Sequence, residues 1–152
     1  MKFVTLNLFF FIAFVLSCSS NSYTTKKKDL ELRDVSFDAV EKKITFSNMP
    51  NSIELLFNDW FENNVKLSGY EGIVKIDITN YLENIKNIQD GKLVELSLDF
   101  KVHIQNNKVQ NKYISGSANS YGSIQGDFSL NDLDIIIYNS QLELVKKFSD
   151  NF

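Results

Sequence analysis

The 152-residue chain has very little cysteine and histidine, which are frequent in catalytic and metal centres: it has one cysteine, Cys18, and one histidine, His103. A zinc site or a cysteine–histidine pair needs more such ligands than this sequence offers. A single cysteine also excludes a disulfide within the chain. The sequence contains neither a glycine-rich phosphate loop nor a nucleophile-elbow motif. We therefore expect a protein that is not an enzyme and that carries no metal or other cofactor.

Excess positive charge and long apolar runs are lacking too. Sixteen Lys and Arg residues stand against 19 Asp and Glu residues, so the formal net charge is -3. A mildly acidic chain is a poor nucleic-acid binder, and we expect no nucleic-acid partner. The apolar run from Leu8 to Leu16 has nine residues, whereas a helix that spans a bilayer needs ~20.

The first 18 residues have the order of an export signal. The positive charge of Lys2 comes first, the short apolar run follows, and the small residue Ser17 ends it. Cys18 stands directly after Ser17. Taken alone, this pattern also fits an uncleaved anchor or an ordinary signal peptide with a chance cysteine.

Val15-Leu16-Ser17-Cys18 resembles the lipobox of bacterial lipoproteins. The resemblance implies that residues 1–17 are a signal peptide, and that Cys18 is lipidated and becomes the first residue of the mature chain. It also implies a diacylglyceryl group and often an amide-linked chain such as palmitate. In the best-studied bacteria an Asp after the cysteine signals retention at the inner membrane. Ser19 therefore favours the periplasmic face of the outer membrane.

Residues 18–29 are polar and show no apolar period, which predicts an acylated cysteine followed by a flexible tether. The three lysines at 26–28 either rest on anionic headgroups or are simply solvated. Residues 30–152 are long enough for a single domain with its own core.

Alternating and helical periods predict the fold of residues 30–152. Alternation across Leu30–Phe46 indicates one long or two short strands, and the cleanest strand runs from Val94 to Ile104. One apolar and one polar face on such a strand is typical of an antiparallel sheet covered on one side. We predict an α+β two-layer sandwich in the order β-α-β-β-β-α. Its antiparallel sheet has about four strands, and two helices cover one face.

Two helices should cover one face of this sheet. Asn51 and Ser52, after Pro50, supply capping chemistry for a helix over Ile53–Leu67 that ends near Gly69. We expect this helix to lie across the Val94–Ile104 strand and to bury Trp60 with Leu98 and Phe100. Ser129 is expected to cap the last helix together with Asp132, three residues later.

Candidate functional residues fall on the polar face and in one loop. The strand period places His103 on the solvated face, where Asp77 and Asp99 are either a carboxylate pair or ordinary surface charges. Tyr113, Tyr121 and Phe128 are candidate partner contacts, because aromatic residues favour interfaces and the segment 121–128 joins the last strand to the last helix.

The lipobox and the element order together resemble the lipopolysaccharide-assembly lipoprotein, the E subunit of the Lpt machinery. They also resemble auxiliary lipoproteins of lipid-trafficking ABC transporters. The run Ile114–Ser120, followed by Leu130–Leu133, resembles uncharacterised alphaproteobacterial lipoproteins. These resemblances imply a non-enzymatic accessory in envelope assembly or lipid transport that binds a β-barrel or transporter component. The alternative is a stand-alone lipid- or glycan-binding module that uses the small-residue strand around Gly116 and Ala118.

Overall fold

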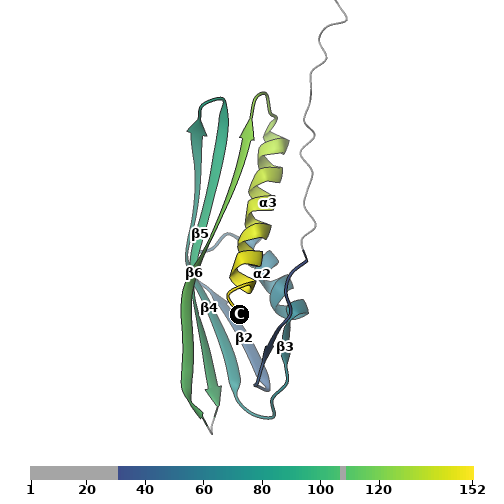
Figure 1. The fold of residues 1–152 in the computed structure, drawn as a ribbon, viewed down its shortest axis with the longest axis vertical. Coiled ribbons are helices and arrows are strands. Elements are labelled where there is room, and N and C mark those ends of the chain that lie inside the picture. The colour runs from purple at the N-terminus through teal and green to yellow at the C-terminus, as the bar shows by residue number, and fades with distance from the viewer. Residues whose placement is uncertain (1–30, 107–108) are drawn as a thin grey trace, which may run out of the picture.

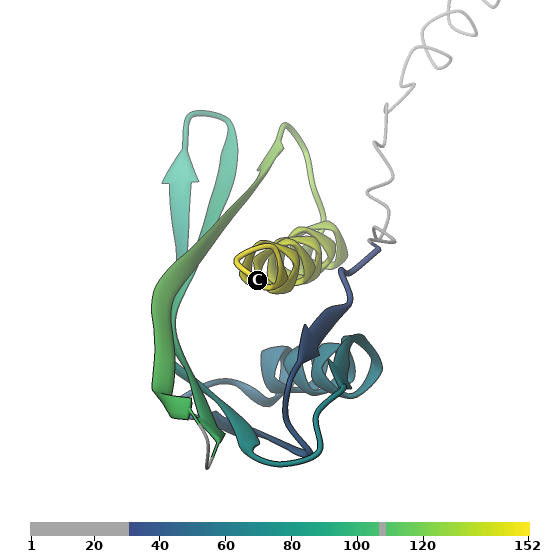
Figure 2. The ribbon, with the colours of Figure 1, turned by 60° about the horizontal axis from the view of Figure 1, so that its bottom comes forward.

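A long, bent sheet and two helices on its inner side form the two layers of the structure (Figures 1 and 2). The computed structural model describes residues 31–106 and 109–152. The predicted signal peptide (1–17) and tether (18–29), with Cys18, lie outside these ranges. So does Asn107, which together with Asn106 the sequence predicts to form a hairpin turn. In chain order the elements are β1 (Val35–Phe37), β2 (Glu41–Phe46), α2 (Asn51–Asn64), β3 (Val65–Leu67), β4 (Ile73–Ile88), β5 (Gly91–Asn106), β6 (Val109–Gln125) and α3 (Leu130–Ser149).

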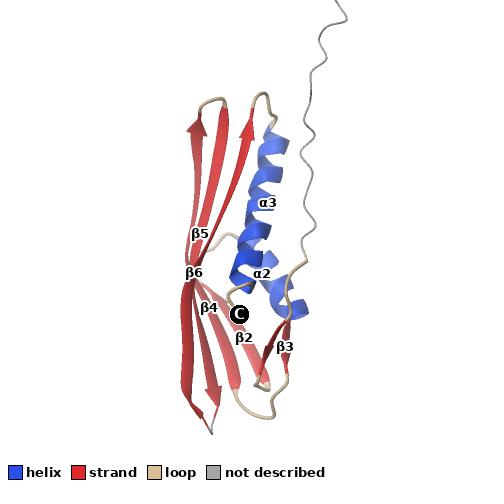
Figure 3. Ribbon diagram, in the orientation of Figure 1, coloured by secondary structure: helices blue, strands red, loops and turns tan. Residues whose placement is uncertain are grey.

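The main sheet has the strand order β2-β4-β5-β6 (Figure 3). The pairs β4–β5 and β5–β6 are antiparallel, as expected for strands joined by hairpins. The predicted α+β class is confirmed, with one difference in detail. β2 runs parallel to β4, because the chain crosses from one to the other through α2, as a parallel pair requires.

The N-terminal alternation corresponds to two short strands that belong to different sheets. β2 joins the main sheet, whereas β1 pairs with β3 in a separate parallel ribbon, Val35 opposite Val65. This pairing also explains why α2 ends at Asn64 and not near Gly69, as the sequence predicted. Val65 is β-branched and buried, and its pairing with β1 replaces further helical turns.

The two helix starts differ from each other. At α2 the N-cap is Pro50, and no side chain caps the helix, so the predicted capping by Asn51 or Ser52 is wrong. The Pro50 carbonyl accepts hydrogen bonds from the backbone N–H groups of Ile53 and Glu54. At α3 the predicted capping box is confirmed. Ser129 Oγ accepts from the Asp132 N–H at 3.2 Å, and an Asp132 carboxylate oxygen accepts from the Ser129 N–H at 2.9 Å.

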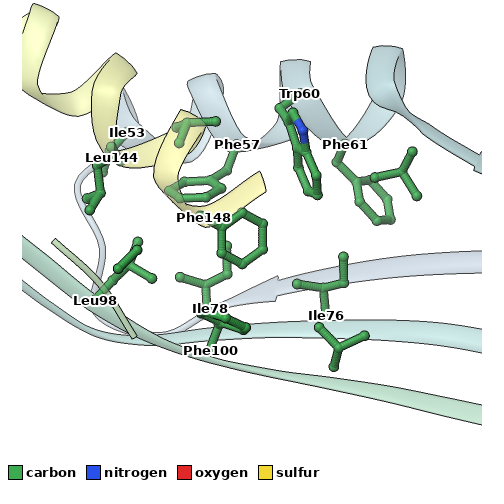
Figure 4. Packing of buried hydrophobic residues seen from close by; sticks show 14 of the residues in the cluster. Ile53, Phe57, Trp60, Phe61, Ile76, Ile78, Leu98, Phe100, Leu144 and Phe148 are labelled. Atoms are coloured by element: carbon green, nitrogen blue, oxygen red, sulfur yellow. The ribbon is translucent and has the colours of Figure 1, made fainter. Parts of the chain in front are cut away.

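The core lies between the sheet and both helices (Figure 4). Its centre is Phe148 of α3, whose ring centroid lies 4.9 Å from that of Phe100 on β5 and 5.1 Å from that of Trp60 on α2. Trp60, Leu98 and Phe100 are buried in one cluster, as predicted. The predicted crossing of α2 over β5 is wrong, because α3 packs on β5 and β6 and its Phe148 separates the other two rings.

We expect Phe100→Ala to lower the free energy of unfolding by about 3–5 kcal/mol, since it removes a buried ring next to Phe148. His103→Ala, on the same strand but on the exposed face, should cost less than about 0.5 kcal/mol. Chemical denaturation of a fragment of residues 30–152 measures both. Equal losses would contradict the assignment of the two faces of β5.

Candidate functional site: the uncovered face of the sheet

Alternation along β5 and β6 separates a buried face from an uncovered polar face. The even-numbered residues of β5 from Val94 to Val102 are buried, and both helices lie on their side of the sheet (Figures 1 and 2). No helix in the described part of the chain covers the opposite side, which we call the outer face. It carries Lys75, Asp77, Thr79, Leu82, Asn84, Glu95, Ser97, Asp99, Lys101, His103, Tyr113, Ser115, Ser117, Asn119 and Tyr121.

Two of the three predicted contact residues lie on this face. Tyr113 is 73% exposed and Tyr121 is 63% exposed, and both belong to β6. Eight residues separate them along the strand, or about 27 Å at ~3.4 Å per residue. Phe128 is half-buried in the segment between β6 and α3. The strand therefore brings Tyr113 and Tyr121 onto one surface and leaves Phe128 apart from them.

Shallow hollows lie along the outer face. One of about 240 Å³ is lined by Leu82, Asn84, Glu95, Ser97, Asn119 and Tyr121. A second, of about 410 Å³, lies over Asn80, Asp99, Lys101 and Ser117. Both linings combine amide, hydroxyl and charged groups, and the first also has the exposed side chains of Leu82 and Tyr121. Such surfaces bind by hydrogen bonding and stacking at the surface.

Asp77 is the centre of the largest charge cluster on this face. Its carboxylate lies 3.1 Å from Lys75 Nζ and 4.0 Å from His103 Nε2, and the Thr45 hydroxyl donates a hydrogen bond to it. The pKa of the Asp77 carboxyl is below its ordinary value. Partial burial alone would raise it, but the hydrogen bonds from Thr45 and Lys75 and the nearby positive charges of Lys75 and His103 together outweigh the burial.

The structure does not join Asp77 and Asp99 into a carboxylate pair. Asp77 lies opposite Lys101, whereas Asp99 lies opposite Thr79 and accepts a hydrogen bond from Asn80 Nδ2 at 2.9 Å. Within residues 31–106 and 109–152, no group of three His, Cys, Asp or Glu side chains could hold a metal ion. His103 lies on the exposed face, as predicted. Asp77 and Asp99 therefore make separate contacts with neighbouring side chains and do not act as a pair.

Sequence reasoning missed Leu82 and Asn84, because the regular alternation of Val74–Thr79 does not continue beyond Thr79. The register shifts between Thr79 and Leu82, where Asn80 has a φ of 54°. This bulge inverts the alternation, so Leu82 faces outward although Ile78 faces inward. The signal in the sequence was the break in the apolar–polar alternation at Asn80, which indicates a bulge.

The small residues of β6 allow close packing on the inner face. A Cβ added to Gly116 would lie 2.7 Å from Cζ of Phe100, and one added to Gly122 would lie 2.3 Å from Ser140 Oγ of α3. The hydroxyl of Ser120 donates a hydrogen bond to the Ser140 carbonyl at 2.7 Å. Core and helix atoms thus fill the space over Gly116 and Gly122. The alternative hypothesis placed a ligand around Gly116 and Ala118, but on the inner face Phe100 lies against Gly116 and Ala118 is buried.

A second polar link, partly buried, connects α3 to β4. The Tyr81 hydroxyl donates to Glu83 Oε2 at 2.7 Å, and Gln141 Nε2 donates to the same oxygen at 3.5 Å. The pKa of Tyr81 is well above its ordinary value. Burial is the main cause, and the hydrogen bond to Glu83 and the negative charge of Glu83 add to it. Tyr81 therefore remains a neutral hydrogen-bond donor, and its role is structural.

Among the helices that the structure describes, none has the length and apolar character needed to cross a bilayer. No model of a known protein family matches the sequence, and no curated protein is detectably similar to it.

Solved structures that resemble this chain include bacterial lipoproteins. A minor lipoprotein from Acinetobacter baumannii has a TM-score of 0.48 and 12% identity over 73% of this chain and 88% of its own. The rare lipoprotein B from Shewanella oneidensis has a TM-score of 0.47 and 7% identity over 74% and 92%. An uncharacterised lipoprotein B from Nitrosomonas europaea has a TM-score of 0.41 and 10% identity over 82% and 88%. Similarities at this level establish neither a family nor a function for this chain.

Asp77→Asn is expected to lower the free energy of unfolding by at most about 1 kcal/mol at pH 7, because it weakens a partly exposed charge cluster. A carboxyl whose pKa is lower in the folded state stabilises the fold above the unfolded pKa of about 3.9. This contribution is lost as the pH falls through the folded value. Denaturation between pH 7 and pH 2 should show the two proteins converging in acid. A constant difference would show that the Asp77 charge is not the cause.

Proposed function

We propose that this chain is a lipoprotein held by fatty acyl chains on Cys18 at the periplasmic face of the outer membrane. In this proposal it acts as a non-enzymatic accessory in envelope assembly or lipid transport. The observation that carries the proposal is the lipobox-like Val15–Cys18 ahead of a polar segment and a domain with one sheet face uncovered. An anchor places the domain at a membrane, and a broad uncovered face gives it a surface for a partner.

Partner binding is supported by the chemistry of the outer face. Tyr113 and Tyr121 lie on a strand that is paired along its length with β5, so little ordering is needed before they make contact. Tyrosine buries a large area with few rotatable bonds, and its hydroxyl still bonds at a polar boundary. Lys75, Asp77 and Lys101 add charges of both signs, which fits a protein surface better than a uniformly anionic membrane. The partner that we propose is a β-barrel or transporter component of the envelope.

A second candidate is a stand-alone lipid- or glycan-binding module. The hollow beside Tyr121 favours it for a glycan, because an exposed ring lies next to Asn84, Ser97 and Asn119. A sugar ring can stack on tyrosine while its hydroxyls bond to amide groups. In that case the purified chain would retain a small molecule that native mass spectrometry detects.

Cys18→Ser should remove the anchor. A single acyl chain gives only marginal membrane binding, at ~0.8 kcal/mol per buried CH₂, whereas two or three chains hold a protein firmly. We expect the variant to be soluble or to remain as the uncleaved precursor, and cell fractionation with mass measurement of the N-terminus distinguishes the two. A variant that had lost residues 1–17 and still fractionated with membranes would contradict the lipid assignment.

The double variant Tyr113→Ala and Tyr121→Ala should bind its partner much more weakly. We expect it to capture at least tenfold less partner from detergent-solubilised membranes than the parental chain does. Tyr70→Ala is the matched control, because Tyr70 is fully exposed but lies between β3 and β4, off the outer face. It should capture as much partner as the parental chain. Repeated capture of no barrel or transporter component, with a bound amphiphile or glycan in its place, would favour the second candidate.

A further inference from the structure

The two edges of the main sheet are protected to very different degrees. An unpaired strand edge presents free N–H and C=O groups, and proteins usually block it with charges, proline or bulges. At the edge opposite β6, β2 is the outer strand along residues Ile73–Ile78 of β4, and it carries the charged residues Glu41, Lys42 and Lys43. Beyond that point β4 has the register shift at Thr79–Leu82, followed by the charged residues Glu83 and Lys86.

The β6 edge has none of these protections. β6 is the last strand of the sheet, and no strand in the described part of the chain pairs with its outer edge. Its register with β5 is unbroken from Lys112 to Gln125. The 13 residues from Tyr113 to Gln125 contain no charged residue and no proline. A long, regular and neutral edge is the kind of strand that pairs with another chain.

We propose that this edge pairs with the β6 edge of a second copy of the chain, antiparallel, about a two-fold axis at Ser117. Because the strand is neutral, pairing it with itself places no like charges opposite each other. In this register Tyr113 lies opposite Tyr121 of the second copy on the outer face, and the reverse pair follows from the symmetry. Aromatic pairs across antiparallel strands are favourable.

The inner face supports the same register. Ile114 belongs to the inner face, opposite buried Val102, yet it is 47% exposed. In the proposed pair it lies opposite Ser120 of the second copy and diagonal to Gly122. Ile136 of α3 rests over Gly122, where an added Cβ would lie 2.9 Å from Ile136 Cγ2. The pairing thus brings an exposed isoleucine of one copy beside the partly buried isoleucine of the other.

The position of α3 is compatible with this arrangement. α3 contacts the half of β6 that contains Ser120 and Gly122, through Ser140 and Ile136. A two-fold axis at Ser117 places this half beside the opposite half of the second copy's strand. Each α3 then lies, through Ile136, next to Ile114 of the second copy, while Phe148 near its C-terminal end contacts Phe100, which is opposite Gly116 and close to the axis.

Oxidative cross-linking of the full chain in native membranes tests the register. Residues opposite each other in an antiparallel pair have Cα atoms about 4.5–5.5 Å apart, within the range of a disulfide. We expect Ser117→Cys to form a disulfide-linked dimer. Ser123→Cys is the matched control, because Ser123 is also exposed on β6 but would lie ~40 Å from its copy at ~3.4 Å per residue. The parental chain controls for Cys18.

A yield from Ser117→Cys at least tenfold above that of Ser123→Cys would support the proposal. Equal yields, no dimer, or cross-links only to another protein would overturn it. Mass measurement of the purified, detergent-solubilised chain gives a second readout. The parental chain and Ser123→Lys should be dimers, whereas Ser117→Lys places two like charges at the axis and should be a monomer with an unchanged circular dichroism spectrum. Capture of an envelope partner by the parental chain tests the proposed function separately, whether the mass measurement finds a monomer or a dimer.

Discussion

The contact of the Phe148 ring with both layers is the interaction on which the rest of the structure depends. Its centroid lies within 5.2 Å of the rings of Phe57 and Trp60 on α2 and of Phe100 on β5. Each of these contacts is edge-on, the geometry that aromatic rings prefer. Phe148 thus joins α2 to β5 at this point. The large buried side chains of the main sheet all belong to the core on this side.

The consequence for the other side is an uncovered polar surface. β4, β5 and β6 are 16 or 17 residues long, well above the usual five or six. The small residues Gly116 and Gly122 let Phe100 and α3 approach β6 closely. The large side chains of the same strand, Tyr113 and Tyr121, point to the outer face. The same strand thus fixes the core on one face and presents the exposed aromatic residues on the other.

Local patterns predicted those features that depend on neighbouring residues. The strict alternation of Val94–Ile104 identified both faces of β5, and Ser129 with Asp132 identified the start of α3. The same alternation placed His103 on the exposed face. The predictions failed where distant residues decide the structure. The pairing of β1 with β3 ends α2 at Asn64, and the packing of Phe148 places α3 over β5 in the position expected for α2. The sequence did not predict Leu82 as part of the candidate surface, because the bulge at Asn80 inverts the alternation within one strand.

The central claim is that a partner covers the outer face of the sheet in the cell envelope. The most direct measurement is the rate at which a maleimide labels a cysteine at Ser97, in the middle of β5, in isolated native membranes and in the purified chain. A cysteine at Ser52, exposed on α2, is the reference. We expect the Ser97→Cys rate to be at least fivefold lower in membranes than in the purified chain, while the Ser52→Cys rate stays the same. Equal rates at Ser97 in the two preparations would contradict the claim.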